Sequence, residues 1–111
     1  YRCFMQTTFE TFPSNTQFSI ELCDYPELPE TQRERAEARY ARTLERQLGD
    51  AQSVCALYTL MEQLQEASPE DIPPNAPALY QRWLKAVQAA TEAGMQGLGE
   101  AETAYFSIRL Q

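Results

Sequence analysis

The chain has 111 residues, 43% of them hydrophobic, which is enough for one domain with a modest core but not for two. Its formal net charge of −7 argues against direct binding of nucleic acid or anionic lipid by the chain as a whole. There is no histidine, which excludes imidazole-based acid–base catalysis and the triads that depend on it. No stretch approaches the length of apolar sequence that a membrane span requires.

Residues 1–23 predict a β-hairpin. Phe18, Ile20 and Leu22 alternate with polar residues, which is the period of a half-buried strand. In the first half, Tyr1, Cys3, Met5 and Phe9 form an apolar set at odd positions. The segment 13–16 between the halves (Pro-Ser-Asn-Thr) has turn chemistry. A loop of two or four residues there pairs odd positions with even ones, so both apolar sets share one face.

Residues 24–30 contain two prolines, which disfavour a helix and predict a linker. Thr31 followed by Glu34 matches a capping box, a side-chain pattern found where helices begin. We therefore expect a helix to begin at Thr31.

The expected helix extends over residues 31–67, with an apolar residue at every third or fourth position. Gly49 and Asp50 are a candidate stop and restart. The apolar stripe keeps its phase across them, however, which favours one long helix, bent at most. The stripe consists of Ala36, Tyr40, Leu44, Leu48, Ala51, Cys55 and Tyr58.

Residues 68–75 form a proline-rich loop, and a second helix is expected over residues 76–98, with Asn75 as its N-cap. Glycines near the end of this helix lower its propensity. Small residues recur at every fourth position, and we expect them to lie against the first helix. They are Ala89, Ala93, Gly97 and Ala101.

Residues 103–110 alternate polar and apolar side chains, which indicates a strand, although the same residues could extend a helix. We favour the strand because Phe-Ser-Ile-Arg-Leu at 106–110 repeats Phe-Ser-Ile-Glu-Leu at 18–22 in all but one position. Side by side, the two segments would let Glu21 pair with Arg109.

The sequence thus predicts a single α+β domain over residues 1–111. Its parts are an N-terminal β-hairpin, a long antiparallel two-helix hairpin and a C-terminal strand that completes a small antiparallel sheet.

Four arginines form the clearest candidate site. At about 100° per residue they lie within about 60° of one another, opposite the apolar stripe, over roughly 16 Å of helix. Arginine binds carboxylates and phosphates through planar, multiple donors, so this face predicts docking on an acidic or nucleic-acid partner. The alternative is a solvated face, or one that folds back onto the protein's own surface. The four are Arg35, Arg39, Arg42 and Arg46.

Tyr80 and Trp83 are a second candidate. They lie three positions apart on the second helix, beside Arg82. Tyrosine, tryptophan and arginine are enriched in interface hot spots, but packing into the core explains the same pattern.

No catalytic residue, metal site or cofactor is expected. The three cysteines include no CxxC pair, which disfavours a zinc site and a disulfide framework. Cys55 lies on the apolar stripe, with no histidine to activate it. Gly94, Gly97 and Gly99 reverse the order of a dinucleotide fingerprint and indicate a helix end. Free thiols favour a reducing, cytoplasmic compartment.

We therefore expect a small acidic protein that is not an enzyme and that binds another protein as a regulator, adaptor or inhibitor, by occlusion or bridging. One alternative is a DNA mimic, encoded by a phage or mobile element, that inhibits nucleic-acid-binding machinery. Another is a subunit of a nucleic-acid-handling complex that touches nucleic acid through the arginine-lined helix. Self-association as a homodimer is a further expectation, because the core is thin.

Overall fold

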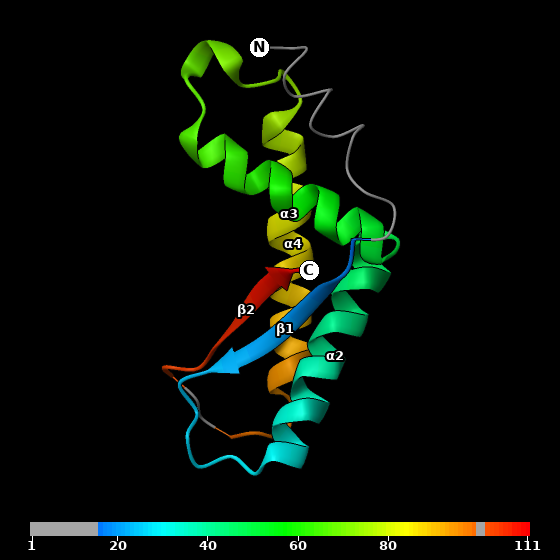
Figure 1. Ribbon diagram of the computed structural model, residues 1–111, viewed down its shortest axis with the longest axis vertical. Coiled ribbons are helices and arrows are strands. Elements are labelled where there is room, and N and C mark those ends of the chain that lie inside the picture. The colour runs from blue at the N-terminus through cyan, green and yellow to red at the C-terminus, as the bar shows by residue number, and fades with distance from the viewer. Residues whose placement is uncertain (1–15, 100–101) are drawn as a thin grey trace.

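The computed structural model describes residues 16–99 and 102–111 (Figure 1). The first strand of the expected hairpin, within residues 1–15, lies outside the described residues. The elements are β1 (Phe18–Cys23), α2 (Glu30–Leu48), α3 (Ala51–Glu66), a short 3₁₀ turn (Pro69–Asp71), α4 (Ala76–Met95) and β2 (Tyr105–Leu110).

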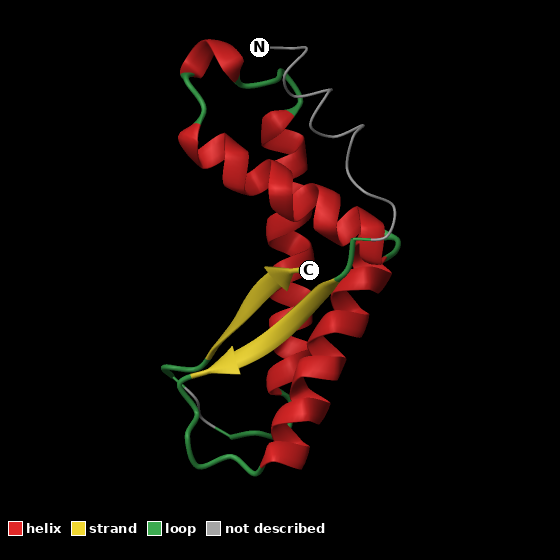
Figure 2. Ribbon diagram, viewed as in Figure 1, coloured by secondary structure: helices red, strands yellow, loops and turns green. Residues whose placement is uncertain are grey.

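Two long helices and a two-stranded sheet make up the body of the fold. α2 and α4 lie side by side and antiparallel, and the sheet covers one side of the pair (Figure 2). α3 turns away from the end of α2 and packs across α4 (Figure 1). The predicted α+β class and helical hairpin are confirmed. None of the helices in the described ranges is long and apolar enough to cross a membrane.

The strand predicted at the C-terminal end is confirmed, and the helical alternative is wrong. β2 pairs antiparallel with β1, with Ile20 opposite Ile108. Glu21 and Arg109 form the predicted ion pair, at 3.4 Å across the exposed face of the sheet. Within the described residues the sheet has these two strands.

The prediction of one helix over 31–67 is wrong, because the chain stops at Leu48 and restarts at Ala51. Gly49 has a φ of 117°, a conformation that few other residues adopt. Asp50 then caps α3, since its carboxylate accepts a hydrogen bond of 2.7 Å from the N–H of Ser53. The glycine conformation and the Asp50 cap therefore end α2 and begin α3, although the apolar stripe keeps the same spacing across the break.

The boundaries of α2 and α4 also differ from the predictions. α2 begins at Glu30, after Pro29, so Thr31 lies inside the first turn and no side chain caps the helix. The expected capping box is therefore wrong. Asn75 occupies the N-cap position of α4 but makes no side-chain capping bond. α4 ends at Met95 rather than at residue 98.

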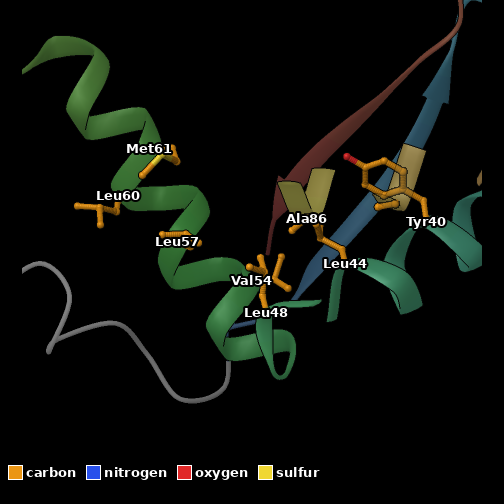
Figure 3. Packing of buried hydrophobic residues seen from close by; sticks show 9 residues of the cluster. Tyr40, Leu44, Leu48, Val54, Leu57, Leu60, Met61 and Ala86 are labelled. Carbon is orange, nitrogen blue, oxygen red and sulfur yellow. The ribbon is translucent and has the colours of Figure 1, made fainter. Parts of the chain in front are cut away.

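The core lies between α2, α3, α4 and the inner face of the sheet. Leu48 and Val54 meet where α2 gives way to α3 (Figure 3). The ring of Tyr40 on α2 stacks on Phe106 of β2, with centroids 4.3 Å apart. The buried cluster contains Tyr40, Leu44, Leu48, Val54, Leu57, Leu60, Met61, Ala86 and Ala90.

The close approach of α4 to its neighbours uses a different row of small residues from the one predicted. Ala86, Ala90 and Gly94 are buried, whereas Ala89 is only half-buried. A Cβ at Gly94 would lie 2.6 Å from Cζ of Phe106, so any other residue there would force the ring or the helix to shift. The predicted row is rotated from the buried one by about one residue, or about 100° around the helix axis.

Candidate binding surface on helix α2

The arginine-rich face of α2 is the strongest candidate site. Arg35, Arg42 and Arg46 are exposed, and within the described part of the chain none of them forms a hydrogen bond or an ion pair. They lie seven and four positions apart, on the side of the helix opposite the buried residues Tyr40 and Leu44. We call Arg35, Arg42 and Arg46 the α2 arginine strip.

Arg39, the fourth predicted residue, forms hydrogen bonds with backbone oxygens of the protein itself. Its Nε donates to the carbonyl oxygen of Ala93 at 3.0 Å, and its Nη2 donates to those of Gly94 and Gln96 at 3.1 and 3.0 Å. These carbonyls end α4, where the helix lacks its own donors and the dipole is negative. Arg39 therefore caps α4 and braces α2 against it.

Two further arginines bind backbone oxygens at the ends of elements. Arg33 donates to the carbonyl oxygens of Leu22 and Tyr25, at 2.7 and 3.2 Å, and so fixes the loop between β1 and α2. Arg82 on α4 donates to the carbonyl oxygen of Leu48, at 3.1 Å, at the end of α2. The arginines of the described residues thus divide into those bound by the protein and those left free.

The structural role of Arg33 was not predicted, although a pattern in the sequence points to it. Arg33 precedes Ala36 and Tyr40 by three and seven positions, so it lies on the same side of the helix as the core. An arginine at such a position buries its stem and directs its head to nearby carbonyls.

The glutamates of α2 leave the strip unneutralised. Glu37 faces the sheet, where its carboxylate accepts a hydrogen bond of 2.6 Å from the N–H of Leu22. Glu34 and Glu45 lie about a quarter turn from the strip. Neither forms an ion pair with an arginine of the strip in the described ranges. The strip is therefore a locally positive surface on an acidic protein.

A small polar hollow adjoins the N-terminal end of the strip. Its volume is about 140 Å³, and it opens between the first half of α2 and the loop that follows α4. Arg35 reaches it from the strip, beside the exposed amide side chains of Gln32 and Gln96. These donors surround a space that suits a carboxylate side chain.

The structure separates Tyr80 from Trp83. Trp83 is half-buried against the core, with its ring 6.0 Å from that of Tyr58. Tyr80 is 51% exposed. Within the described residues no hydrogen bond joins either aromatic side chain to the arginine strip.

The cysteines within the described ranges are Cys23 and Cys55, and both thiols are free. Burial raises the pKa of the Cys55 thiol, and the charge of Glu45 raises it further, so the thiolate is disfavoured.

A second hollow, of about 250 Å³, lies at the α2–α3 junction between Leu48, Ser53 and Arg82.

A comparison of the chain with protein-family models, with curated proteins and with solved structures gave no match. Function is therefore inferred from the side chains of this chain.

Proposed function

We propose that this protein is a non-catalytic binding module that docks on an acidic surface of another protein through the α2 arginine strip. The observation that carries the proposal is the division among its arginines. Arg33, Arg39 and Arg82 bind backbone oxygens, whereas the three arginines of the strip are exposed and have no partner in the described part of the chain. Arginine is enriched at protein interfaces, where its planar donors pair with carboxylates.

The scaffold supports this role because it holds the strip on a rigid element. Arg39 on α2 binds a carbonyl oxygen at the end of α4. The next residue of α2, Tyr40, stacks on Phe106 of β2. The backbone of the strip is therefore ordered before a partner binds, which reduces the entropy lost on docking.

An acidic protein suits the strip better than nucleic acid does. The net charge of −7 repels a polyanion at long range, whereas a partner with a local acidic patch can meet the strip alone. Bound in this way, the domain would act as a regulator, adaptor or inhibitor by covering the partner's surface or by bridging two partners. Its free thiols suit a reducing compartment, and we place this action in the cytoplasm.

The test compares two triple variants of equal net charge. The first neutralises the strip with Arg35→Gln, Arg42→Gln and Arg46→Gln. The control adds the same negative charge at exposed positions on α3 and α4, with Gln65→Glu, Gln81→Glu and Gln88→Glu. A short tetraglutamate peptide, which carries a local acidic patch and no long polyanionic chain, and a DNA duplex serve as labelled ligands, titrated at low and at physiological salt.

The proposal predicts that the wild-type protein binds the peptide more tightly than the duplex and that salt weakens this binding. Neutralising the strip should weaken peptide binding by roughly 3- to 160-fold, because each of the three exposed ion pairs contributes about 0.2–1 kcal/mol. The control should bind almost as the wild type does. Equal losses in both variants would show a general charge effect and contradict the proposal.

Two other outcomes distinguish the alternatives. Stronger binding of the duplex than of the peptide, lost in the strip variant, would replace the proposal with a nucleic-acid-associated subunit. Binding of neither ligand, together with binding of a poly-lysine peptide, would favour a DNA mimic that acts through its acidic surface. Either result overturns the proposed function.

A further inference from the structure

Among the residues that the structure describes, no strand pairs with the outer edge of β2. Gln111 donates to the carbonyl oxygen of Gln17 at 2.8 Å, which marks these two residues as a hydrogen-bonded pair of the antiparallel ladder. Hydrogen-bonded and non-bonded pairs alternate along such a ladder. The N–H and C=O groups of Phe106, Ile108 and Leu110 therefore point away from β1, and within the described residues they have no hydrogen-bond partner.

The corresponding edge of β1 is covered at Leu22. Its N–H donates to Glu37 at 2.6 Å, and its carbonyl oxygen accepts from Arg33 at 2.7 Å. Two side chains of α2 thus occupy the groups that another strand would need. Among the described residues β2 has no such cover, and Figure 1 shows no helix or strand beside its outer edge.

The β2 edge also lacks the usual features that prevent pairing. Its six residues, Tyr-Phe-Ser-Ile-Arg-Leu, include no proline and no lysine. Its one charged side chain, Arg109, lies on the outer face, where it is paired with Glu21. A regular edge of this kind is a template for a further strand.

The pairing of β1 with β2 indicates which strand would fit. Phe18 lies opposite Leu110, Ile20 opposite Ile108, and Leu22 opposite Phe106. Because the two strands share the sequence Phe-Ser-Ile-x-Leu, this pairing is nearly symmetric about Ile20 and Ile108. β2 already pairs, therefore, with a close copy of itself.

We infer that the β2 edge binds the β2 edge of a second copy of this chain. The two strands pair antiparallel, with Ile108 opposite the partner's Ile108 and Phe106 opposite the partner's Leu110. The twofold axis stands perpendicular to the sheet, so the apolar residues of both strands stay on the face that the helices cover. The result is a four-stranded sheet across the dimer, through a surface that is separate from the α2 arginine strip.

The charges of the outer face are complementary in this register. Ser107 lies opposite Glu21 within its own copy and opposite the partner's Arg109 across the dimer. Each row of the four-stranded sheet then holds one glutamate and one arginine, separated by a serine. No like charges face each other, which would have opposed pairing.

Ser107 offers a matched pair of variants with opposite effects. In Ser107→Lys the new cation lies beside Glu21 of its own copy, and this attraction does not depend on dimerisation. Across the dimer it faces the partner's Arg109, and this repulsion disfavours dimerisation. Ser107→Glu reverses both interactions. Since each interface holds two such contacts, we expect Ser107→Lys to raise the dimer dissociation constant by roughly 2- to 30-fold and Ser107→Glu to lower it.

Sedimentation equilibrium from micromolar to millimolar protein measures these constants, because a strand-edge interface is small and weak. Amide hydrogen exchange of the wild type gives a second reading that needs no variant. The amides of Phe106, Ile108 and Leu110 should become protected as concentration rises, with the same midpoint as dimerisation. The amide of Arg109, which faces β1, should be protected throughout.

Several results would overturn the inference. One is a monomer at every concentration. Another is a dimer that responds to neither variant at Ser107, or in which the three outward amides exchange as fast as in the monomer. A protein that stays monomeric alone but gains protection there on adding an unrelated β-strand peptide would show that the edge takes a foreign strand instead.

Discussion

Arg39 and Arg82 lie at opposite ends of the α2–α4 pair, and each binds the C-terminal carbonyl oxygens of the helix that carries the other. Arg39 on α2 binds three carbonyls at the end of α4, and Arg82 on α4 binds that of Leu48 at the end of α2. Each guanidinium satisfies acceptors that the antiparallel helix cannot satisfy itself. The arrangement fixes how far one helix can slide along the other.

Arg39→Ala should therefore destabilise the fold, although the residue belongs to the same helix face as the binding strip. Losing charged hydrogen bonds to half-buried carbonyls should lower the free energy of unfolding by about 2 kcal/mol. Arg42→Ala, three positions along the same face, is the matched control and should change it by less than about 0.5 kcal/mol. Urea denaturation followed by the fluorescence of Trp83, the single tryptophan, measures both. Equal effects would contradict the capping role.

Gly94→Ala tests the contact between α4 and the sheet. An added Cβ would lie 2.6 Å from Cζ of Phe106 and 3.2 Å from the carbonyl oxygen of Ala36. Overpacking of this kind should lower the free energy of unfolding by about 1–3 kcal/mol. In a Phe106→Leu background the same change should cost less, because the clashing ring atoms are gone. A double-mutant cycle by thermal denaturation reports the coupling, and strictly additive effects would show that the ring is not the obstacle.

Asp50, at the α2–α3 junction, makes a pH-dependent contribution to the free energy of unfolding. The N–H of Ser53 donates to its carboxylate, which lowers the pKa of Asp50 from its ordinary value of 3.8. A lowered pKa means that the ionised cap stabilises the fold above pH 3.8 and that this contribution is lost as pH falls through the folded value. Asp50→Asn keeps an acceptor for Ser53 but does not titrate.

The free energy of unfolding of the wild type should therefore fall relative to Asp50→Asn only below about pH 4, with a constant difference from about pH 5 upward. Asp50→Ala, which removes the acceptor, should be less stable than either protein at neutral pH. A difference between wild type and Asp50→Asn that does not vary with pH would exclude a titrating cap.

The two strands and their pairing could be predicted because both leave a signal in the sequence. Alternation at Phe18, Ile20 and Leu22 selects a strand, and the repeated sequence at 106–110 identifies its partner. The break at Gly49 was missed because an apolar stripe can keep its phase through a short interruption. The backbone conformation of the glycine and the cap by Asp50 decide the outcome there, and neither changes the spacing of the stripe.

The face of the arginines could be predicted from their spacing, but the division among them could not. Arg35, Arg39 and Arg42 have nearly the same direction on the helix wheel. Arg39 differs because the end of α4 lies beside it, and that end is set by the tertiary fold. Sequence spacing reports direction around a helix and not what lies opposite.

Side-chain NMR of the arginine Nε–H groups, during titration with the tetraglutamate peptide, tests the central claim most directly. The account predicts that the signals of Arg35, Arg42 and Arg46 shift together and saturate at one dissociation constant. Arg33, Arg39 and Arg82, held by backbone oxygens, serve as controls within the same spectrum and should move little. Shifts confined to these three controls, or equal shifts at all arginines, would contradict the assignment of the α2 arginine strip as the binding surface.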